Sequence, residues 1–241
     1  MIPAELTPAQ IVLIVTAALF LAFECLVFVV RGRGESVLIS HMRALAWLNT
    51  RVLHRLRVRG AQGDPLPHSG ACIVVANHQC GADPVFLSVI TRRPVRFLMA
   101  REYYNHWLFR WLFKRLRCIP VNRDGNDLRA TKDALKALHD GECIGIFPQG
   151  GIRAVDGLED SKNGVALLAL RTGATIVPFY IDTTASSEGV FRSVFLPSRT
   201  RVYCGSPTAL RPEPVRKPSR EEIEAATRTI LESIYSLKPA E

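Results

Sequence analysis

The sequence predicts an α/β domain built around a largely buried sheet, preceded by an apolar anchor at the N-terminus. From residue 72 onward, short apolar runs of strand length alternate with segments in which apolar residues recur at helical spacing. Residues 11–30 hold no lysine or arginine and one acid, Glu24, which indicates the anchor. The 241 residues are enough for one domain with its own core and such an anchor.

The composition excludes several classes of protein. With 48% hydrophobic and 22% charged residues, the chain is too apolar to be disordered. Its 16 Gly and 15 Pro are too few for a low-complexity or collagen-like chain. The formal net charge of +9 suggests an anionic lipid, an anionic substrate or a nucleic acid as partner.

The N-terminal apolar run favours a retained membrane anchor over a cleaved secretory signal. Twenty helical residues span about 30 Å, the thickness of the hydrocarbon core of a bilayer. A secretory signal has basic residues before a shorter apolar run, whereas here Arg31 and Arg33 follow the run and none precedes it. We therefore predict a transmembrane or membrane-embedded anchor over residues 1–34, with the remaining chain on the cytoplasmic face. Glu24 is either a functional carboxylate or a neutral acid near a partner helix or the membrane interface.

The next segment, residues 35–60, predicts a basic amphipathic helix. Apolar residues recur at helical spacing between Leu38 and Leu56, and the arginines of this stretch lie among them. Such a helix suits an anionic membrane surface, and a core-facing helix with a solvated basic side fits the same pattern. A loop rich in proline and glycine then leads into the main domain, residues 61–241.

The elements of that domain follow in order along the chain. Strand-like runs cover residues 72–76, 95–99, 118–121, 143–147, 175–181 and 201–204. Helical patterns cover residues 83–90, 102–114, 128–139, 161–171 and 219–237, the last with a capping box at its start. The six cysteines show no metal-binding spacing and mostly fall in apolar runs, which predicts reduced thiols.

The first motif with chemical potential, residues 77–84, directly follows a predicted strand. A histidine at the end of a strand lies where α/β folds place their sites. Asp83, five residues after His78, can hold one ring nitrogen and leave the other as a general base. The alternative interpretation is a capping aspartate beside a loop histidine. Cys80 is disfavoured as a nucleophile, since side chains two apart in an extended turn diverge from one another.

Three further positions are suited to an anion. Arg123 ends a predicted strand, and its guanidinium either binds a phosphate or pairs with a nearby aspartate. Gly150 and Gly151 form a turn after another strand, where backbone N–H groups can approach an anion closely. This turn lacks the Lys-Ser/Thr of a nucleotide-binding P-loop. Lys162 stands at the start of a predicted helix, whose N-terminus attracts anions.

Four motifs in this order resemble those of the glycerolipid acyltransferases, and most closely the 1-acylglycerol-3-phosphate (lysophosphatidic acid) acyltransferases. They are Asn-His-x4-Asp at 77–83, the strand ending in Arg123, Phe-Pro-x-Gly at 147–150 and Val-Pro at 177–178. The resemblance implies a mixed, mostly parallel sheet flanked by helices. It also implies transfer of a fatty acyl group from acyl-CoA or an acyl-carrier protein to the free hydroxyl of a lysophospholipid, with no cofactor or metal.

The resemblance also implies roles for individual residues. His78 deprotonates the acceptor hydroxyl, and Asp83 orients His78 and stabilises its charge. The alkoxide attacks the thioester directly, without an acyl-enzyme. Together with the anion-binding positions, the expected substrate-binding residues are Arg123, Gln149, Gly150, Gly151, Arg153 and Lys162, with Arg123 at the acceptor phosphate.

Departures from the family pattern leave the acceptor head group open. Gln149 replaces the usual Glu, Arg153 comes one residue late, and Arg117 replaces a common Gly. We expect 1-acylglycerol-3-phosphate as acceptor, giving phosphatidic acid, with another lysolipid as the alternative. A non-catalytic lipid-binding membrane protein of the same fold is the alternative from a different class.

Residues 92–123 hold nine Lys or Arg and one acid, and aromatic residues lie among these cations from Trp107 to Lys114. Aromatic side chains beside cations are typical of a membrane-docking surface. They also suit stacking on single-stranded nucleic acid, but no nucleic-acid-binding fold signature accompanies them. The expected partners are therefore membrane lipid, a lysophospholipid and an acyl thioester donor, and no nucleic acid.

Overall fold

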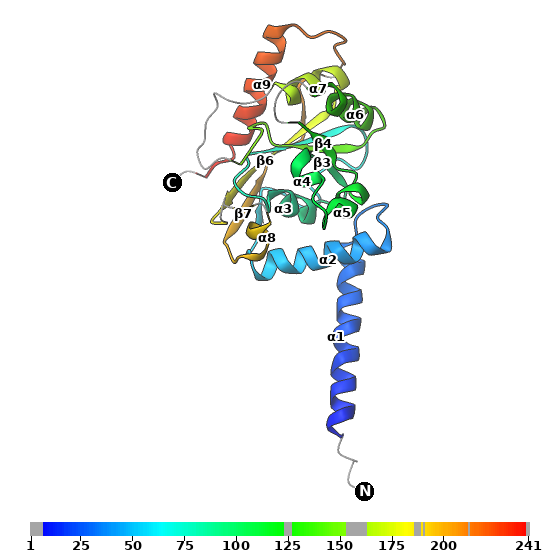
Figure 1. Cartoon of the computed structure of the whole chain (residues 1–241). Coiled ribbons are helices and arrows are strands. Elements are labelled where there is room, and N and C mark those ends of the chain that lie inside the picture. The colour runs from blue at the N-terminus through cyan, green and yellow to red at the C-terminus, as the bar shows by residue number, and fades with distance from the viewer. Residues whose placement is uncertain are drawn as a thin grey trace.

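The computed structural model describes residues 7–122, 127–152, 163–185, 189, 191–211 and 213–239. In this part of the chain, eight strands form one mixed, mostly parallel sheet with helices on both faces. A long helix projects from one end of this domain (Figure 1). The α/β architecture predicted from the sequence is confirmed.

The sheet places β2 at its centre, where the predicted active-site loop begins. In chain order the strands are β1 (Arg57–Arg59), β2 (Cys72–Ala76), β3 (Val95–Ala100), β4 (Ile119–Val121), β5 (Cys143–Ile146), β6 (Thr175–Thr183), β7 (Thr200–Cys204) and β8 (Thr208–Ala209). Their order across the sheet is β1-β7-β6-β2-β5-β3-β4, and β8 pairs with β6. Only β6–β7 and β6–β8 are antiparallel among the described pairs. The carboxyl ends of β2 and β5 therefore meet at one edge.

Helices cover both faces of the sheet. The described helices, of which α1 alone projects away from the domain, are α1 (Pro8–Val30), α2 (Val37–Val52), α3 (Asp83–Ile90), α4 (Arg101–Tyr104), α5 (Arg110–Arg115), α6 (Leu128–His139), α7 (Gly164–Thr172), α8 (Arg192–Phe195) and α9 (Arg220–Tyr235). Ile73 and Val75 of β2 belong to the core formed with α6, α7 and α9. Their neighbours Cys72 and Val74 belong to the second core, formed with α3. This alternation along β2 is the ordinary period of a strand.

The helix predicted over residues 35–60 is shorter than expected. α2 ends at Val52, and β1 follows and pairs with β7. The chain reverses at Arg55, which has a φ of 46°, a left-handed conformation that no α-helix contains. Burial of Leu56 in the core stabilises this reversal. Most of the arginines of this segment therefore lie outside the helix.

The helix predicted over residues 102–114 is also divided. α4 ends at Tyr104, a turn follows, and α5 begins at Arg110. Stacking of Phe109 on Phe191, with ring centroids 4.6 Å apart, accompanies this break. The sequence did not predict the short edge strands β1 and β8, which have three and two residues.

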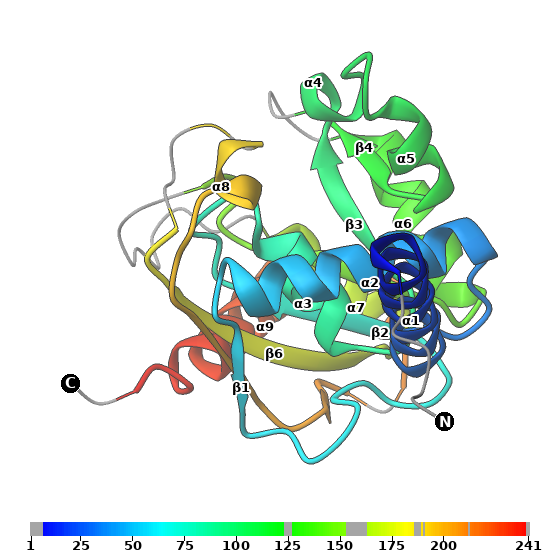
Figure 2. The same ribbon diagram turned by 90° about the horizontal axis from the view of Figure 1, so that it is seen from below.

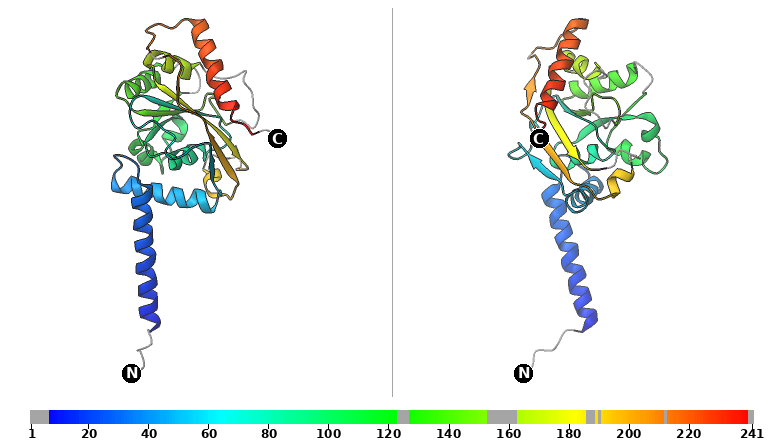
Figure 3. Two further views of the ribbon diagram at one scale, coloured as in Figure 1. Left: turned by 180° about the vertical axis from the view of Figure 1, so that it is seen from behind. Right: turned by 90° about the vertical axis from the view of Figure 1, so that its left-hand side faces the viewer.

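α1 extends away from the domain, and α2 lies across its end (Figures 1 and 3). Ile11–Val30 of α1 is long and apolar enough to cross a membrane, a criterion that an N-terminal signal sequence also meets. Its side chains are largely exposed; Phe28, for example, is 83% exposed. α2 turns Ser40, Ala44 and Thr50 toward the domain, where they are buried.

Candidate active site

The loop between β2 and α3 carries His78, and both neighbouring side chains attach it to β6. Nδ2 of Asn77 donates to the carbonyl of Ile181 at 2.8 Å, and Oδ1 accepts from the N–H of Ile181 at 2.7 Å. Oε1 of Gln79 accepts a hydrogen bond from the N–H of Thr183 at 3.1 Å. These bonds fix the backbone on either side of His78.

Asp83 begins α3 and is completely buried. Its Oδ2 accepts hydrogen bonds from the N–H groups of Gln79 at 2.7 Å and Cys80 at 3.0 Å. The same oxygen lies 2.8 Å from Nδ1 of His78. This contact assigns the proton of a neutral imidazole to Nδ1 and leaves a lone pair on Nε2. Within the described residues, Nε2 has no hydrogen-bond partner.

Cys80 lies beside the carboxylate but is unsuited to be a nucleophile. Its thiol donates to Oδ1 of Asp83 at 3.2 Å. Burial, reinforced by the charge of Asp83, raises the pKa of the Cys80 thiol far above its usual range. Because the thiolate is the nucleophilic form of cysteine, this environment suppresses its reactivity.

Two aromatic rings fix the plane of the imidazole. Phe147, directly after β5, stacks on His78 with ring centroids 4.2 Å apart and an interplanar angle of 16°. Phe97 of β3 in turn stacks on Phe147, with centroids 5.9 Å apart. Stacking on one face and a hydrogen bond at one edge leave the ring little freedom to rotate.

Gln149 connects the His78 loop to the C-terminal helix. Its side-chain Oε1 accepts a hydrogen bond from the backbone N–H of His78 at 2.7 Å. Its Nε2 donates to the hydroxyl of Tyr235 in α9 at 2.9 Å. The residue is 5% exposed and is not among the residues that line the adjacent cavity.

The turn after Gln149 requires glycine at one of its two positions. Gly150 has a φ of 68°, the left-handed region that glycine tolerates, and its N–H donates to the carbonyl of Phe147 at 3.0 Å. A Cβ at Gly151 would meet no atom within 4 Å. Both glycines line the cavity.

A cavity of about 880 Å³ lies over the edge where β2 and β5 end, and His78 is part of its wall. Most of its lining is apolar, with Asn122, Thr131 and Asn163 among the polar exceptions. A second cavity of about 710 Å³ lies between α2, α3, β3 and α5. The two share lining residues, including Phe97 and Phe113, so they are neighbours along β3. Volumes of this size suit a small organic ligand or an aliphatic chain.

The structure brings together His78, Asp83, Gln149, Gly150 and Gly151, and the other predicted site residues lie outside the described residues: Arg123, Arg153 and Lys162. Their described chain neighbours Asn122, Ile152 and Asn163 line the first cavity. Within the described ranges, no group of three His, Cys, Asp or Glu could hold a metal ion.

Sequence reasoning missed three residues that hold the site. Asn77 and Phe147 belong to the motifs at 77–83 and 147–150. Their positions next to predicted site residues could have indicated a role in holding the site. Tyr235 carries no such signal, because only the folded chain brings α9 to the turn at Gln149.

Comparisons with known proteins give a family model and several relatives. The family model described as "Acyltransferase" matches residues 56–182. The 1-acyl-sn-glycerol-3-phosphate acyltransferase of Bacillus subtilis is 25% identical over 175 residues, which cover 72% of this chain and 84% of that protein. The Streptococcus pneumoniae protein of the same name is 24% identical over 160 residues, or 66% of this chain and 57% of that protein.

Solved structures share the fold as well. The crystal structure of the 1-acyl-sn-glycerophosphate (LPA) acyltransferase PlsC from Thermotoga maritima superposes with a TM-score of 0.62 and 21% sequence identity. The match covers 83% of this chain and 81% of that chain.

Proposed function

This chain belongs to the acyltransferase family, and on that premise we propose that it transfers a fatty acyl group from an acyl thioester to the free hydroxyl of 1-acylglycerol-3-phosphate, giving phosphatidic acid. The relatives named above support this choice of acceptor. The single observation that carries the proposal is the contact between His78 and the buried Asp83, at the wall of a largely apolar cavity.

The proposed reaction uses His78 as general base. Nε2 removes the proton of the acceptor hydroxyl, while Asp83 holds Nδ1–H and stabilises the imidazolium that forms. The acceptor oxygen attacks the thioester carbonyl, a new C–O bond forms, and the C–S bond breaks. The departing thiolate takes the proton from His78. Because the acceptor oxygen attacks the thioester directly, no acyl-enzyme is formed. The suppressed reactivity of Cys80 agrees with direct transfer.

The two neighbouring cavities suit the aliphatic chains of the substrates. Their walls are mostly apolar, and they meet close to His78 at shared residues that include Gly81 and Pro84. Burial of an aliphatic chain there removes apolar surface from water, which stabilises the complex by about 0.8 kcal/mol per methylene group. We assign these cavities to the acyl chains of the thioester and the lysolipid.

For the acceptor phosphate we propose Arg123, Arg153 and Lys162, supported by the cavity-lining positions of Asn122 and Asn163. Guanidinium and ammonium groups are the usual protein ligands of phosphate. Gly150 and Gly151 leave the backbone accessible beside them. For Gln149, whose polar atoms contact His78 and Tyr235, we propose positioning of the catalytic loop in place of substrate contact.

We further propose that α1 anchors the enzyme in a membrane with the domain on the cytoplasmic face. The apolar length of Ile11–Val30 supports the anchor, and Arg31 and Arg33 directly after it support the orientation. A membrane location brings the enzyme to its lipid acceptor. The acyl donor, acyl-CoA or an acyl-carrier protein, reaches the site from the cytoplasm.

The test is release of free CoA from acyl-CoA by the purified full-length chain, with and without lysolipid. We expect release only when 1-acylglycerol-3-phosphate is present. Since general-base catalysis contributes roughly 10² to 10⁴-fold, His78→Ala and Asp83→Asn should each lower kcat by about that factor.

The matched control is His139→Ala, which removes an exposed histidine of α6 outside the site. It should leave kcat unchanged. Equal rates for the His78→Ala protein and the unaltered protein would show that His78 is not the general base. Absence of CoA release with every lysolipid would favour a lipid-binding protein without catalysis.

A further inference from the structure

A hydrophobic and basic surface of the domain remains unexplained by acyl transfer. The turn before α5, α5 itself and α8 expose large apolar side chains: Trp107 is 83% exposed, Phe195 65%, Trp111 47% and Leu108 46%. Arg110, Lys114 and Arg115 are exposed among them. We name these seven side chains the docking patch.

The arrangement of these side chains is set by a short helical segment. Hydrogen bonds from the N–H of Arg110 to the carbonyl of His106 and from Phe113 to Phe109 continue the helical pattern through the turn. Trp107, Trp111 and Lys114 are therefore spaced by four and three residues and share one outward stripe. Phe109 lies on the other side and stacks on Phe191. That inner contact joins the α5 and α8 parts of the docking patch.

The charge of the docking patch is uncompensated. Residues 103–118 contain no Asp or Glu. Within the described residues, none of Arg110, Lys114 and Arg115 forms an ion pair. Exposed tryptophan next to free cations is the composition of a surface that enters the headgroup region of an anionic bilayer.

The docking patch lies at the end of the domain from which α1 projects. Figures 1 and 2 show α5 and α8 beside α2, both on the same side of it. Side-chain contacts agree with this placement: α2, α5 and α8 line one cavity, and Nδ2 of Asn49 in α2 donates to the carbonyl of Val194 in α8 at 3.3 Å. α2 also exposes Leu45 and Val52. The docking patch thus continues the apolar surface beside the proposed anchor.

We propose that the docking patch is a second membrane contact, by which the domain binds the anionic surface of the bilayer in which α1 is anchored. Trp107, Trp111 and Phe195 enter the headgroup region, and Arg110, Lys114 and Arg115 pair with lipid phosphates. This contact holds the mouth of the cavity between α2, α5 and α8 against the lipid. The proposal rests on the membrane location of α1 but not on acyl transfer.

The first test measures the depth of Trp107 in the full-length chain. Trp47→Phe and Trp111→Phe together leave Trp107 as the sole tryptophan, because the chain has three. The protein is reconstituted in phosphatidylcholine–phosphatidylglycerol vesicles that contain acyl-chain-brominated lipid, which quenches tryptophan at close range. We expect Trp107 to be quenched clearly, and less so in phosphatidylcholine alone.

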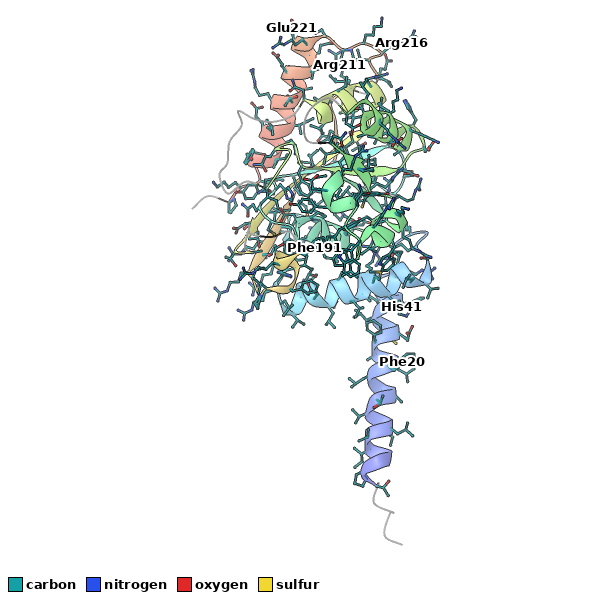
Figure 4. The ribbon with its side chains drawn as sticks, in the orientation of Figure 1. Phe20, His41, Phe191, Arg211, Arg216 and Glu221 are labelled. Atoms are coloured by element: carbon teal, nitrogen blue, oxygen red, sulfur yellow. The ribbon has the colours of Figure 1, made fainter. Side chains whose placement is uncertain are left out.

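Two reference positions calibrate the quenching. In a background with all three tryptophans replaced by Phe, Phe20→Trp reports on α1, and Glu221→Trp reports on the opposite end of the domain (Figure 4). Phe20→Trp should be quenched strongly and Glu221→Trp hardly at all. Trp107 should fall between them.

The second test removes the charge of the docking patch. Each cation near an anionic surface shifts the docking equilibrium about fivefold. Arg110→Gln, Lys114→Gln and Arg115→Gln together should therefore bring the quenching of Trp107 close to that of Glu221→Trp. The matched control replaces Arg211, Arg216 and Lys217 by Gln. It removes the same charge at the far end, where Figure 4 places Arg211 and Arg216, and should leave the quenching unchanged.

Three results would overturn the proposal. The first is a Trp107 as unquenched as Glu221→Trp while Phe20→Trp is quenched, which leaves the anchor intact and removes the second contact. The second is a quenching of Trp107 that stays the same when Arg110, Lys114 and Arg115 are replaced by Gln. The third combines two observations: Trp107 is not quenched, and the charge variant loses binding to an acidic acyl-carrier protein or to single-stranded nucleic acid. This result would assign the docking patch to that partner. None of these readouts requires an active enzyme.

Discussion

Gln149 shows how a single buried amide can connect the His78 loop to a helix distant in the sequence. By the family resemblance a glutamate is usual at this position, and a carboxylate can only accept hydrogen bonds. The amide accepts from the N–H of His78 and donates to the hydroxyl of Tyr235. We therefore propose that the departure concerns the bonds that hold His78 and does not select the acceptor head group.

Replacement of Gln149 tests this assignment. Gln149→Leu leaves the N–H of His78 and the hydroxyl of Tyr235 without this partner, which should lower the free energy of unfolding by about 1–3 kcal/mol and reduce kcat. Gln149→Glu restores an acceptor for the N–H of His78 and should retain most of the activity. Neither variant should alter the ranking of a panel of lysolipid head groups. A changed ranking would mean that Gln149 contacts the acceptor.

At the scale of elements, Arg43 of α2 forms a buried ion pair with Glu35, just before α2, and its hydrogen bonds attach α2 to α3. Nε of Arg43 donates to Oε1 of Glu35 at 2.8 Å, and the two side chains are 9% and 4% exposed. Nη1 of Arg43 also donates to the carbonyls of Ser88 and Thr91, at the carboxyl end of α3. Arg43, one of the arginines of the predicted basic amphipathic helix, is thus turned into the domain. α3 begins with Asp83, so this attachment also supports the site.

Removal of one partner of the Arg43–Glu35 ion pair should destabilise the fold strongly. Arg43→Ala leaves the carboxylate of Glu35 buried and unpaired, which typically lowers the free energy of unfolding by about 3–5 kcal/mol. The double variant Glu35→Gln with Arg43→Met leaves no buried charge at this place. Its free energy of unfolding should therefore fall clearly less than that of Arg43→Ala. Denaturant unfolding of the full-length protein in detergent micelles measures both. Equal losses for the two proteins would show that the ion pair is not the source of the stability.

The junction between α1 and α2 should depend on pH. His41 of α2 contacts the carbonyl of Val37 at 2.8 Å and the carboxylate of Glu24 in α1 at 3.1 Å. These acceptors, first the Val37 carbonyl and then Glu24, raise the pKa of His41 above its usual range. Because the folded pKa is raised, the contact is complete below the unfolded pKa and is lost as the pH rises through the folded value.

A pair of spin labels on α1 and α2 measures this effect. The distance distribution between them should widen as the pH rises from about 5 to about 9, across the range in which histidine titrates. In His41→Gln the distribution should be the same at both pH values. A pH dependence that survives this substitution would assign the effect to another group.

At the scale of the whole molecule, the anchor, α2 and the docking patch lie at one end, and α9 lies toward the other (Figures 1 and 3). With α1 as the proposed anchor, this arrangement turns the docking patch toward the bilayer and α9 away from it. A transmembrane α1 has its two ends exposed to different compartments, and Arg31 and Arg33 predict that the domain lies on the cytoplasmic face.

Cysteine labelling tests that orientation. In a Cys25→Ser background the remaining cysteines are buried, so a new surface cysteine can be labelled selectively. Thr7→Cys should react with a membrane-impermeant maleimide in intact cells, and Leu128→Cys in α6, 71% exposed, only after permeabilisation. The reverse pattern would place the domain on the opposite face, and labelling of both in intact cells would exclude a transmembrane anchor.

The sequence by itself determined the fold class and most of the elements. The runs over β2, β5, β6, α3 and α6 were predicted nearly to their ends, because period-2 and period-3.6 patterns are local properties of the chain. The neighbourhood of His78 and Asp83 was accessible for the same reason: five residues of loop suffice to bring them together. The failures lie at residues 53–60 and 105–109, where a contact distant in sequence ends a helix that the local pattern would continue.

Only the tertiary structure decided what surrounds the site and which way each arginine turns. Gln149 and Tyr235 meet through α9, and His78 stacks on Phe147 because β2 and β5 pair in parallel. Arg43 faces the domain because Glu35 and the carboxyl end of α3 lie there. A buried polar side chain is stable only when it has a hydrogen-bond or ion-pair partner, and here several of those partners come from distant parts of the chain. The local sequence pattern does not identify such partners.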